Sequence, residues 1–271
     1  MKKYTIGFLI TVATILTIVA SCKKDDTGLN LFTIDQDIEF GQTLDDTIVS
    51  DPGQFPILDP AEYPVAYEHI ERIRNAILAS GELKYDDKFD WQVRIINDDV
   101  LNAFAAPGGF MYFYTGIIKF LDNEAQFAGV MAHEMAHCDK RHSTENMTKQ
   151  YGFSVMMGML LGNNPSQLAQ IAAGMAQGLE SLAFSRKNEY EADEYAVKYL
   201  NATTYYPPAL GDFFEKMEGE KTTSYTPTFL KTHPSPTDRL EKINETWVSL
   251  GSNQGETYEA RYQEFKNSLP Q

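Results

Sequence analysis

Residues 127–138 of the chain read FAGVMAHEMAHC, an apolar pattern interrupted by two histidines and a glutamate. Phe127, Val130 and Met131 have the spacing of an amphipathic helix. His133 and His137 are four residues apart, so a helix places both imidazoles on one face, one turn apart. Two imidazoles in this arrangement can bind one Zn²⁺.

The residue after the first histidine supplies a candidate base. Glu134 follows His133, where its carboxylate can take a proton from a metal-bound water. The alternative is a surface helix that carries two unrelated histidines. A catalytic zinc site also requires a third protein ligand and an open position for water.

A second acidic segment can supply that ligand. Residues 189–193 read EYEAD, and Glu189 and Asp193 share one face of a predicted helix while Glu191 points elsewhere. One carboxylate can bind the metal while the other accepts a hydrogen bond from a ligand histidine. Alone, the segment would be a solvated acidic face. Together with the histidine pair it predicts one zinc ion per chain.

The surrounding pattern predicts a mostly helical α+β domain with a small sheet. Asp122 is the expected N-cap of the helix that carries the histidine pair. Apolar spacing and cap residues predict helices over 34–48, 63–77, 122–149, 151–162, 165–184, 186–201, 208–217, 235–250 and 256–268. Alternating and aromatic runs predict strands over 90–97 and 110–114.

The aromatic strand is a candidate substrate platform. Phe110, Met111 and Tyr112 follow Gly109 and could present a free strand edge. An extended polypeptide would pair with such an edge through backbone hydrogen bonds, which gives little sequence preference. The alternative is an interior strand.

The first residues resemble an export signal. Residues 1–21 combine two lysines, a 15-residue apolar run and small residues before Cys22. The run is shorter than the roughly 20 residues of a transmembrane helix. We expect a lipoprotein signal peptide, lipidation of Cys22, a charged tether over 22–33 and a single domain over 34–271. The alternative is an ordinary signal peptide with Cys22 as a spare thiol.

The charge of the chain limits its partners. Its formal charge is −15, and removal of Lys2 and Lys3 with the leader makes it −17. Nucleic-acid binding requires clustered Lys and Arg that contact phosphate, so this class is excluded. We also expect no binding to anionic membrane surfaces, and membrane attachment only through the N-terminal lipid.

Several motifs in combination resemble one gluzincin family, that of the CAAX prenyl proteases, HtpX, the mitochondrial Oma proteases and BepA. The resemblance rests on five segments of this chain: Asn102-Ala103-Phe104, Gly108-Gly109 with Thr115-Gly116, Ala132 to His142, Ser185 to Asp193, and His233-Pro234 with Arg239. It spans about 34–243 and implies a zincin-like fold, with Glu189 as third ligand, Asp193 as its outer partner, and the aromatic strand as the substrate edge.

The resemblance also draws attention to His233 and Arg239. Either side chain could stabilise the oxyanion of the reaction, and His233 could instead bind zinc as a latch that displaces the water. We expect His142 to be structural and His69 to have no part in a metal site. The chain departs from integral-membrane relatives in having no hydrophobic span after its leader, and from BepA in having no helical-repeat domain.

Three functions follow from these patterns. The first is a zinc endopeptidase that acts on misfolded or flexible envelope polypeptides, lipid-anchored at the outer membrane on its periplasmic or surface face. The second is a zinc-stabilised binding or holdase lipoprotein without turnover. The third is a structural lipoprotein with a fortuitous histidine pair, which predicts no bound zinc.

Overall fold

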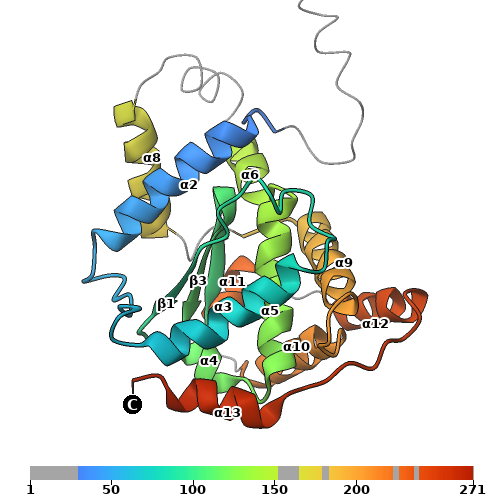
Figure 1. Ribbon diagram of the computed structural model, residues 1–271. Helices are drawn as coiled ribbons and strands as arrows, with labels where there is room; N and C mark the ends of the chain where they lie inside the picture. The colour runs from blue at the N-terminus through green and yellow to red at the C-terminus, as the bar shows by residue number, and fades with distance from the viewer. Residues whose placement is uncertain (1–29, 152–164, 179–182, 222–225, 235–237, 271) are drawn as a thin grey trace, which may run out of the picture.

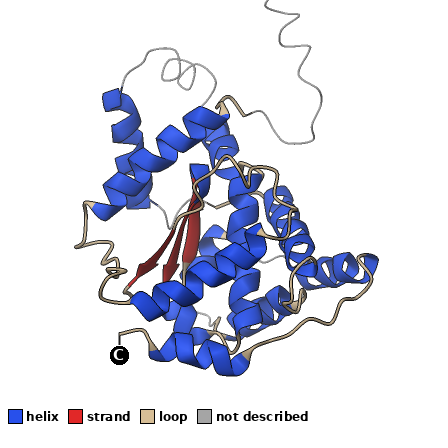
Figure 2. Ribbon diagram, viewed as in Figure 1, coloured by secondary structure: helices blue, strands red, loops and turns tan. Residues whose placement is uncertain are grey.

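A small sheet lies among helices that cover both of its faces (Figures 1 and 2). The computed structural model describes residues 30–151, 165–178, 183–221, 226–234 and 238–270. The mostly helical α+β class is confirmed. Cys22 and nearly all of the helix predicted over 151–162 lie outside the described residues.

The described helices follow the predicted order, with two short additions. They are α2 (Ile34–Val49), α3 (Pro64–Leu78), α4 (Thr115–Phe120), α5 (Glu124–Asp139), α6 (His142–Tyr151), α8 (Pro165–Gly178), α9 (Arg186–Asn201), α10 (Ala209–Gly219), α11 (Thr228–Thr232), α12 (Arg239–Ser249) and α13 (Glu259–Asn267). Helices α4 and α11 were not predicted. Residues 183–185 are not helical, so α8 ends short of the predicted Phe184.

The sheet has the strand order β1-β3-β2, formed by β1 (Val93–Ile96), β2 (Ala103–Ala106) and β3 (Phe110–Tyr114). Strand β3 pairs parallel with β1 and antiparallel with β2. The short 3-10 turn η1 (Pro107–Gly109) joins β2 to β3, and both of its glycines have positive φ. Glycine adopts this conformation without steric cost, which explains the Gly-Gly pair at the turn.

The prediction that Gly109, Phe110, Met111 and Tyr112 form a free substrate edge is wrong. Both edges of β3 are paired, and all five of its residues are buried. Five consecutive apolar residues without polar alternation are typical of a strand covered on both faces. Within the described residues, the outer edge of β1 forms a bridge from Ile96 to Ile57, whereas no strand pairs with the outer edge of β2. The free strand edge therefore belongs to β2, which the sequence did not predict, although its Ala105 carbonyl accepts a hydrogen bond from the Ser143 hydroxyl.

The two faces of the sheet pack against different helices. Met111 and Phe113 join the core that includes α3 and α5, whereas Phe110, Tyr112 and Tyr114 join the core that includes α2 and α8. Figure 1 shows α2 and α8 side by side, and α9, α10 and α12 gathered on the other side of α5.

Helix α5 is the central helix of the molecule. All of its residues are buried, so it is not the amphipathic helix that its apolar spacing predicted. Its N-cap is Asn123, whose side chain accepts a hydrogen bond from the Gln126 N–H, and not the predicted Asp122. The helix predicted to continue to Lys149 ends at Asp139, because Arg141 adopts a left-handed φ of 61° that redirects the chain into α6.

The last residues of the predicted tether are packed against the domain. Phe32 is buried, and the Arg141 guanidinium donates to its carbonyl. Thr33 caps α2 by accepting from the Gln36 N–H. Residues 30–33, which the sequence assigned to the tether, are therefore part of the packed domain. None of the described helices is long and apolar enough to cross a bilayer.

Candidate metal centre

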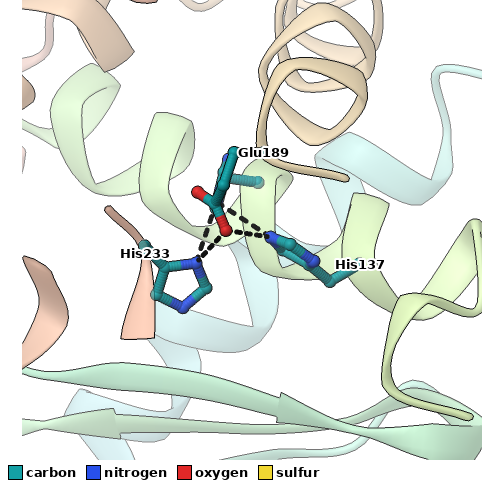
Figure 3. A group of neighbouring side chains, drawn as sticks. His137, Glu189 and His233 are labelled. Atoms are coloured by element: carbon teal, nitrogen blue, oxygen red, sulfur yellow. Dashed lines mark hydrogen bonds and ion pairs between the residues drawn. The ribbon is translucent and has the colours of Figure 1, made fainter. Parts of the chain in front are cut away.

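Four side chains from three parts of the chain converge in the interior. His133 and His137 lie on α5, Glu189 lies on α9, and His233 directly follows α11. Each residue offers one nitrogen or oxygen atom, and these four atoms all lie within 4.8 Å of one another. All four residues are buried. Figure 3 shows His137 and His233 on either side of the Glu189 carboxylate.

The individual distances describe a tight cluster. Nε2 of His133 lies 3.1 Å from Nε2 of His137 and 3.3 Å from Nδ1 of His233. Glu189 Oε1 lies 3.6 Å from His137 Nε2 and 3.2 Å from His233 Nδ1. The close packing of α5 against α9 holds these groups together, since each helix contributes donors to a point between them.

Asp193 and Arg239 support the cluster from behind. The Arg239 guanidinium donates to both carboxylate oxygens of Asp193, at 2.7 and 2.6 Å, and Asp193 Oδ1 lies 3.0 Å from Nδ1 of His133. Arg239 Nη1 also lies 3.0 Å from Glu189 Oε2. Asp193 thus occupies the predicted position of an outer partner to a histidine.

The prediction of Arg239 as an oxyanion donor does not fit these contacts. The side chain is fully buried, and its Nε, Nη1 and Nη2 are all engaged with Asp193, Glu189 or the Pro234 carbonyl. Four of the five N–H donors of the guanidinium are thus directed at protein groups, which favours a role in holding the carboxylates. Arg239 positions the carboxylates.

Glu134 lies beside the cluster without a hydrogen-bond partner for either oxygen. Nε2 of His233 lies 3.5 Å from Oε1 of Glu134. Burial raises the pKa of the Glu134 carboxyl above its ordinary value. A carboxylate with a raised pKa accepts a proton more readily, as a general base requires.

The pKa shifts of two members of the cluster, Glu189 and His137, match those of metal donors. Burial raises the pKa of Glu189, but the charges and hydrogen bonds of His233, His133 and Arg239 outweigh it and hold that pKa well below its usual range. Burial lowers the pKa of His137 well below its ordinary value. An ionised carboxylate and a neutral imidazole are the forms that bind a metal.

The residues therefore fit a zinc ion by donor chemistry. Two imidazole nitrogens and a carboxylate oxygen form the His₂Glu set found in catalytic zinc sites. Both Glu134 oxygens are buried polar atoms without a hydrogen bond. Buried polar atoms in folded proteins have partners as a rule, which supports a ligand at this point.

A small apolar cavity of about 40 Å³ adjoins the cluster. Its wall runs from the outer edge of β2 to the segment around His233, and it is lined by Leu44, Phe104, Ala105, Ala106, Ser143, Asn146, Met147, Met175, Phe184, Thr232 and His233. The free edge of β2 and the metal cluster thus border the same space.

A family model described as Peptidase family M48 matches residues 65–247. This range contains the four clustered side chains, Glu134, Asp193 and Arg239, and it covers more than half of the chain. The chain belongs to peptidase family M48. The predicted resemblance is therefore confirmed.

Three M48-like relatives illustrate the match. The chain is 30% identical over 223 residues to a protein named putative beta-barrel assembly-enhancing protease from Vibrio cholerae, covering 79% of this chain and 44% of that protein. It is 35% identical over 156 residues to the Escherichia coli K12 beta-barrel assembly-enhancing protease, covering 54% and 32%. It is 30% identical over 192 residues to the Schizosaccharomyces pombe mitochondrial metalloendopeptidase OMA1, covering 70% and 55%. The chain thus spans less than half of the length of these bacterial relatives.

Two other histidines complete the comparison with the sequence. His69, on α3, stacks on Phe265, and its Nδ1 lies 3.0 Å from Nη2 of Arg72. His142 was predicted to be structural, yet its Nδ1 lies 3.0 Å from Nδ1 of His137. The sequence did not predict this contact, because His142 follows His137 by five residues and the helix is broken between them at Arg141.

Proposed function

We propose that this chain is a zinc metalloendopeptidase in which His133, His137 and Glu189 bind the metal and Glu134 is the general base. The observation that carries the proposal is the convergence of these donors in a buried cluster, with an unpartnered carboxylate beside it. Membership of a peptidase family supports the reaction class. One zinc ion per chain accounts for the donor set.

Each residue of the proposed site has a separate task. Bound zinc would polarise the scissile carbonyl and acidify the attacking water. Glu134 takes the proton of that water and passes it to the leaving amine. Asp193 orients the His133 ring from Nδ1, and Arg239 holds Asp193 and Glu189 in place. Burial of the cluster strengthens these electrostatic interactions.

His233 has two possible roles in the proposed enzyme, and the geometry favours one. Its Nδ1 lies among the donor atoms, 3.3 Å from His133 Nε2, which supports a role as fourth ligand that holds a latent state. Its Nε2 faces Glu134 at 3.5 Å. If the ring turned out of the cluster, that nitrogen could instead donate to an oxyanion.

We propose that an extended polypeptide binds along the outer edge of β2. Tyr114 N–H donates to the Asn102 carbonyl, and Phe104 pairs with Tyr112, so Ala103 and Ala105 direct their backbone groups away from β3. Ala105 is partly exposed and lines the cavity next to His233. Backbone pairing at this edge would select unfolded or flexible segments over particular sequences.

The predicted export signal and the names of two relatives support a proposal for where the enzyme acts. Two relatives are named for enhancement of β-barrel assembly, and we propose quality control of misfolded or flexible envelope polypeptides for this chain as well. A lipid on Cys22 would anchor the enzyme at the outer membrane. The variant Cys22→Ala should then move from the membrane to the soluble fraction, and unchanged fractionation would contradict the anchor.

Metal analysis combined with one isosteric variant tests the function. The purified mature protein should contain about one zinc per chain and digest casein until a chelator is added. Glu134→Gln should keep the zinc and lose casein digestion by several orders of magnitude. Zinc without turnover in the parent protein would favour the binding or holdase alternative, and no zinc would favour a structural lipoprotein.

A further inference from the structure

The two histidines of the metal cluster have different outer partners. His133 directs its Nδ1 to a carboxylate, that of Asp193, at 3.0 Å. His137 directs its Nδ1 to another imidazole, with 3.0 Å between Nδ1 of His137 and Nδ1 of His142. Both rings are fully buried. The sequence predicted a structural role for His142 and no contact with His137.

The chemistry of this pair fixes where the protons lie. Nε2 of His137 faces the donor atoms of His133 and Glu189, so it must be free of a proton to bind a metal. A neutral imidazole then carries its proton on Nδ1 and donates it to the facing nitrogen. Nδ1 of His142 must accept, which leaves the proton of His142 on Nε2.

Glu191 is the acidic side chain next to that nitrogen. Its Oε2 is 3.5 Å from Nε2 of His142, just beyond the usual hydrogen-bond length. Its side chain is 25% exposed, whereas that of His142 is fully buried. A carboxylate oxygen can only accept, so it suits an N–H on this nitrogen.

We propose that His142 and Glu191 are positioning residues that hold His137 in the Nδ1–H form and so set the affinity of the site for zinc. The inference rests on the zinc site of the proposed function. The chain of contacts runs from Glu191 through His142 to His137, from α9 across α6 to α5. Of these three residues only Glu191 is partly exposed, so the chain of contacts that positions His137 extends to the surface. The Asp193 carboxylate next to His133 is buried instead.

The alternative is that His142 is a packed core histidine whose contact with His137 has no consequence. A nonpolar replacement of similar size would then preserve the site. An amide distinguishes the two explanations, because the Asn oxygen can accept the Nδ1–H of His137 whereas a leucine cannot. Partners of this outer kind typically change metal affinity by about 10–100-fold when removed.

Zinc affinity, measured by competition with a fluorescent chelator on the full mature chain, tests the proposal. His142→Leu should weaken zinc binding by about 10–100-fold, and His142→Asn should recover most of that loss. Glu191→Gln should weaken binding by at most about tenfold. Circular dichroism of the metal-free variants checks that each is folded.

Glu194→Gln is the matched control. Glu194 lies on the same helix as Glu191, and its side chain is 49% exposed. It pairs with Lys198 at 2.6 Å rather than with either imidazole. The control removes the same charge and should leave zinc affinity unchanged. If Glu191→Gln and Glu194→Gln lose the same zinc affinity, the loss comes from the removed charge and not from the contact with His142, which would overturn the proposal.

Imidazole ¹⁵N NMR of the zinc-loaded protein gives a second readout that packing alone would not determine. The expected spectrum has His142 protonated at Nε2 and His137 at Nδ1. The opposite form of His142, or parent-like affinity in His142→Leu, would refute the inference while the parent still binds zinc and digests casein. Failure of the parent to bind zinc would instead refute the proposed function.

Discussion

Removal of the Arg239 side chain charge should destabilise the metal-free protein strongly. Arg239 is fully buried and donates two hydrogen bonds to Asp193, and it lies 3.0 Å from Glu189. The variant Arg239→Met keeps much of the apolar stem but leaves two buried carboxylates with His133 as their one remaining cation among the described contacts. Breaking a buried pair in this way costs about 3–5 kcal/mol.

This loss converts into a large thermal shift. For a domain of this size about 1 kcal/mol corresponds to roughly 2–4 °C in Tm, so the expected fall is about 6–20 °C. The assay is thermal unfolding followed by circular dichroism in the presence of a chelator, which removes any contribution of bound metal. The double variant Arg239→Met with Asp193→Asn should recover part of the loss, because it removes one of the stranded charges.

Lys242→Met is the control on the same helix. Lys242 is 44% exposed and pairs with Asp238 at 3.9 Å, so its removal should change stability by less than about 1 kcal/mol. If Arg239→Met unfolds within the error of Lys242→Met, the guanidinium does not neutralise the buried carboxylates. If the double variant is no more stable than the single one, the stranded charge is not the cause.

Three further predictions concern the metal centre and its substrate. Burial lowers the pKa of His133, but Asp193 and Glu189 outweigh it and raise that pKa to about 9, so zinc must displace a proton at pH 7. Zinc affinity should therefore rise about tenfold per pH unit between pH 7 and 9 and level off above pH 9. Calorimetry in buffers of different ionisation enthalpy should show that about one proton is released on zinc binding at pH 7. Absence of proton release would contradict the raised pKa of His133. Ala105→Pro removes an outward N–H without breaking the pairing of β2 with β3. The kcat/KM for casein-derived peptides should therefore fall while zinc content is retained, and parent-like kinetics would mean that substrate does not bind at this edge. His233→Ala should increase casein digestion if the side chain is a latch and decrease it if the side chain is an oxyanion donor, and unchanged kinetics with unchanged zinc affinity would exclude both roles.

Local spacing was sufficient to find most of the residues that meet in the cluster. Two histidines one turn apart share a helix face in any helix, which makes that pair a local property of the sequence. Helix α9 was predicted with its bounds and its Ser185 cap, because cap and helical period are also local signals. The family resemblance added His233, whose distance in sequence from α5 hides its proximity.

The sequence by itself thus determined most of the longer helices, the candidate ligands on α5 and α9, and the mostly helical class. Tertiary structure decided which strand edge is free, because pairing of β3 on both sides depends on segments distant in the chain. It also decided that Arg239 neutralises two carboxylates and that His142 meets His137 after the break at Arg141. These outcomes depend on non-local packing and on burial of charge, for which short-range periodicity carries no signal.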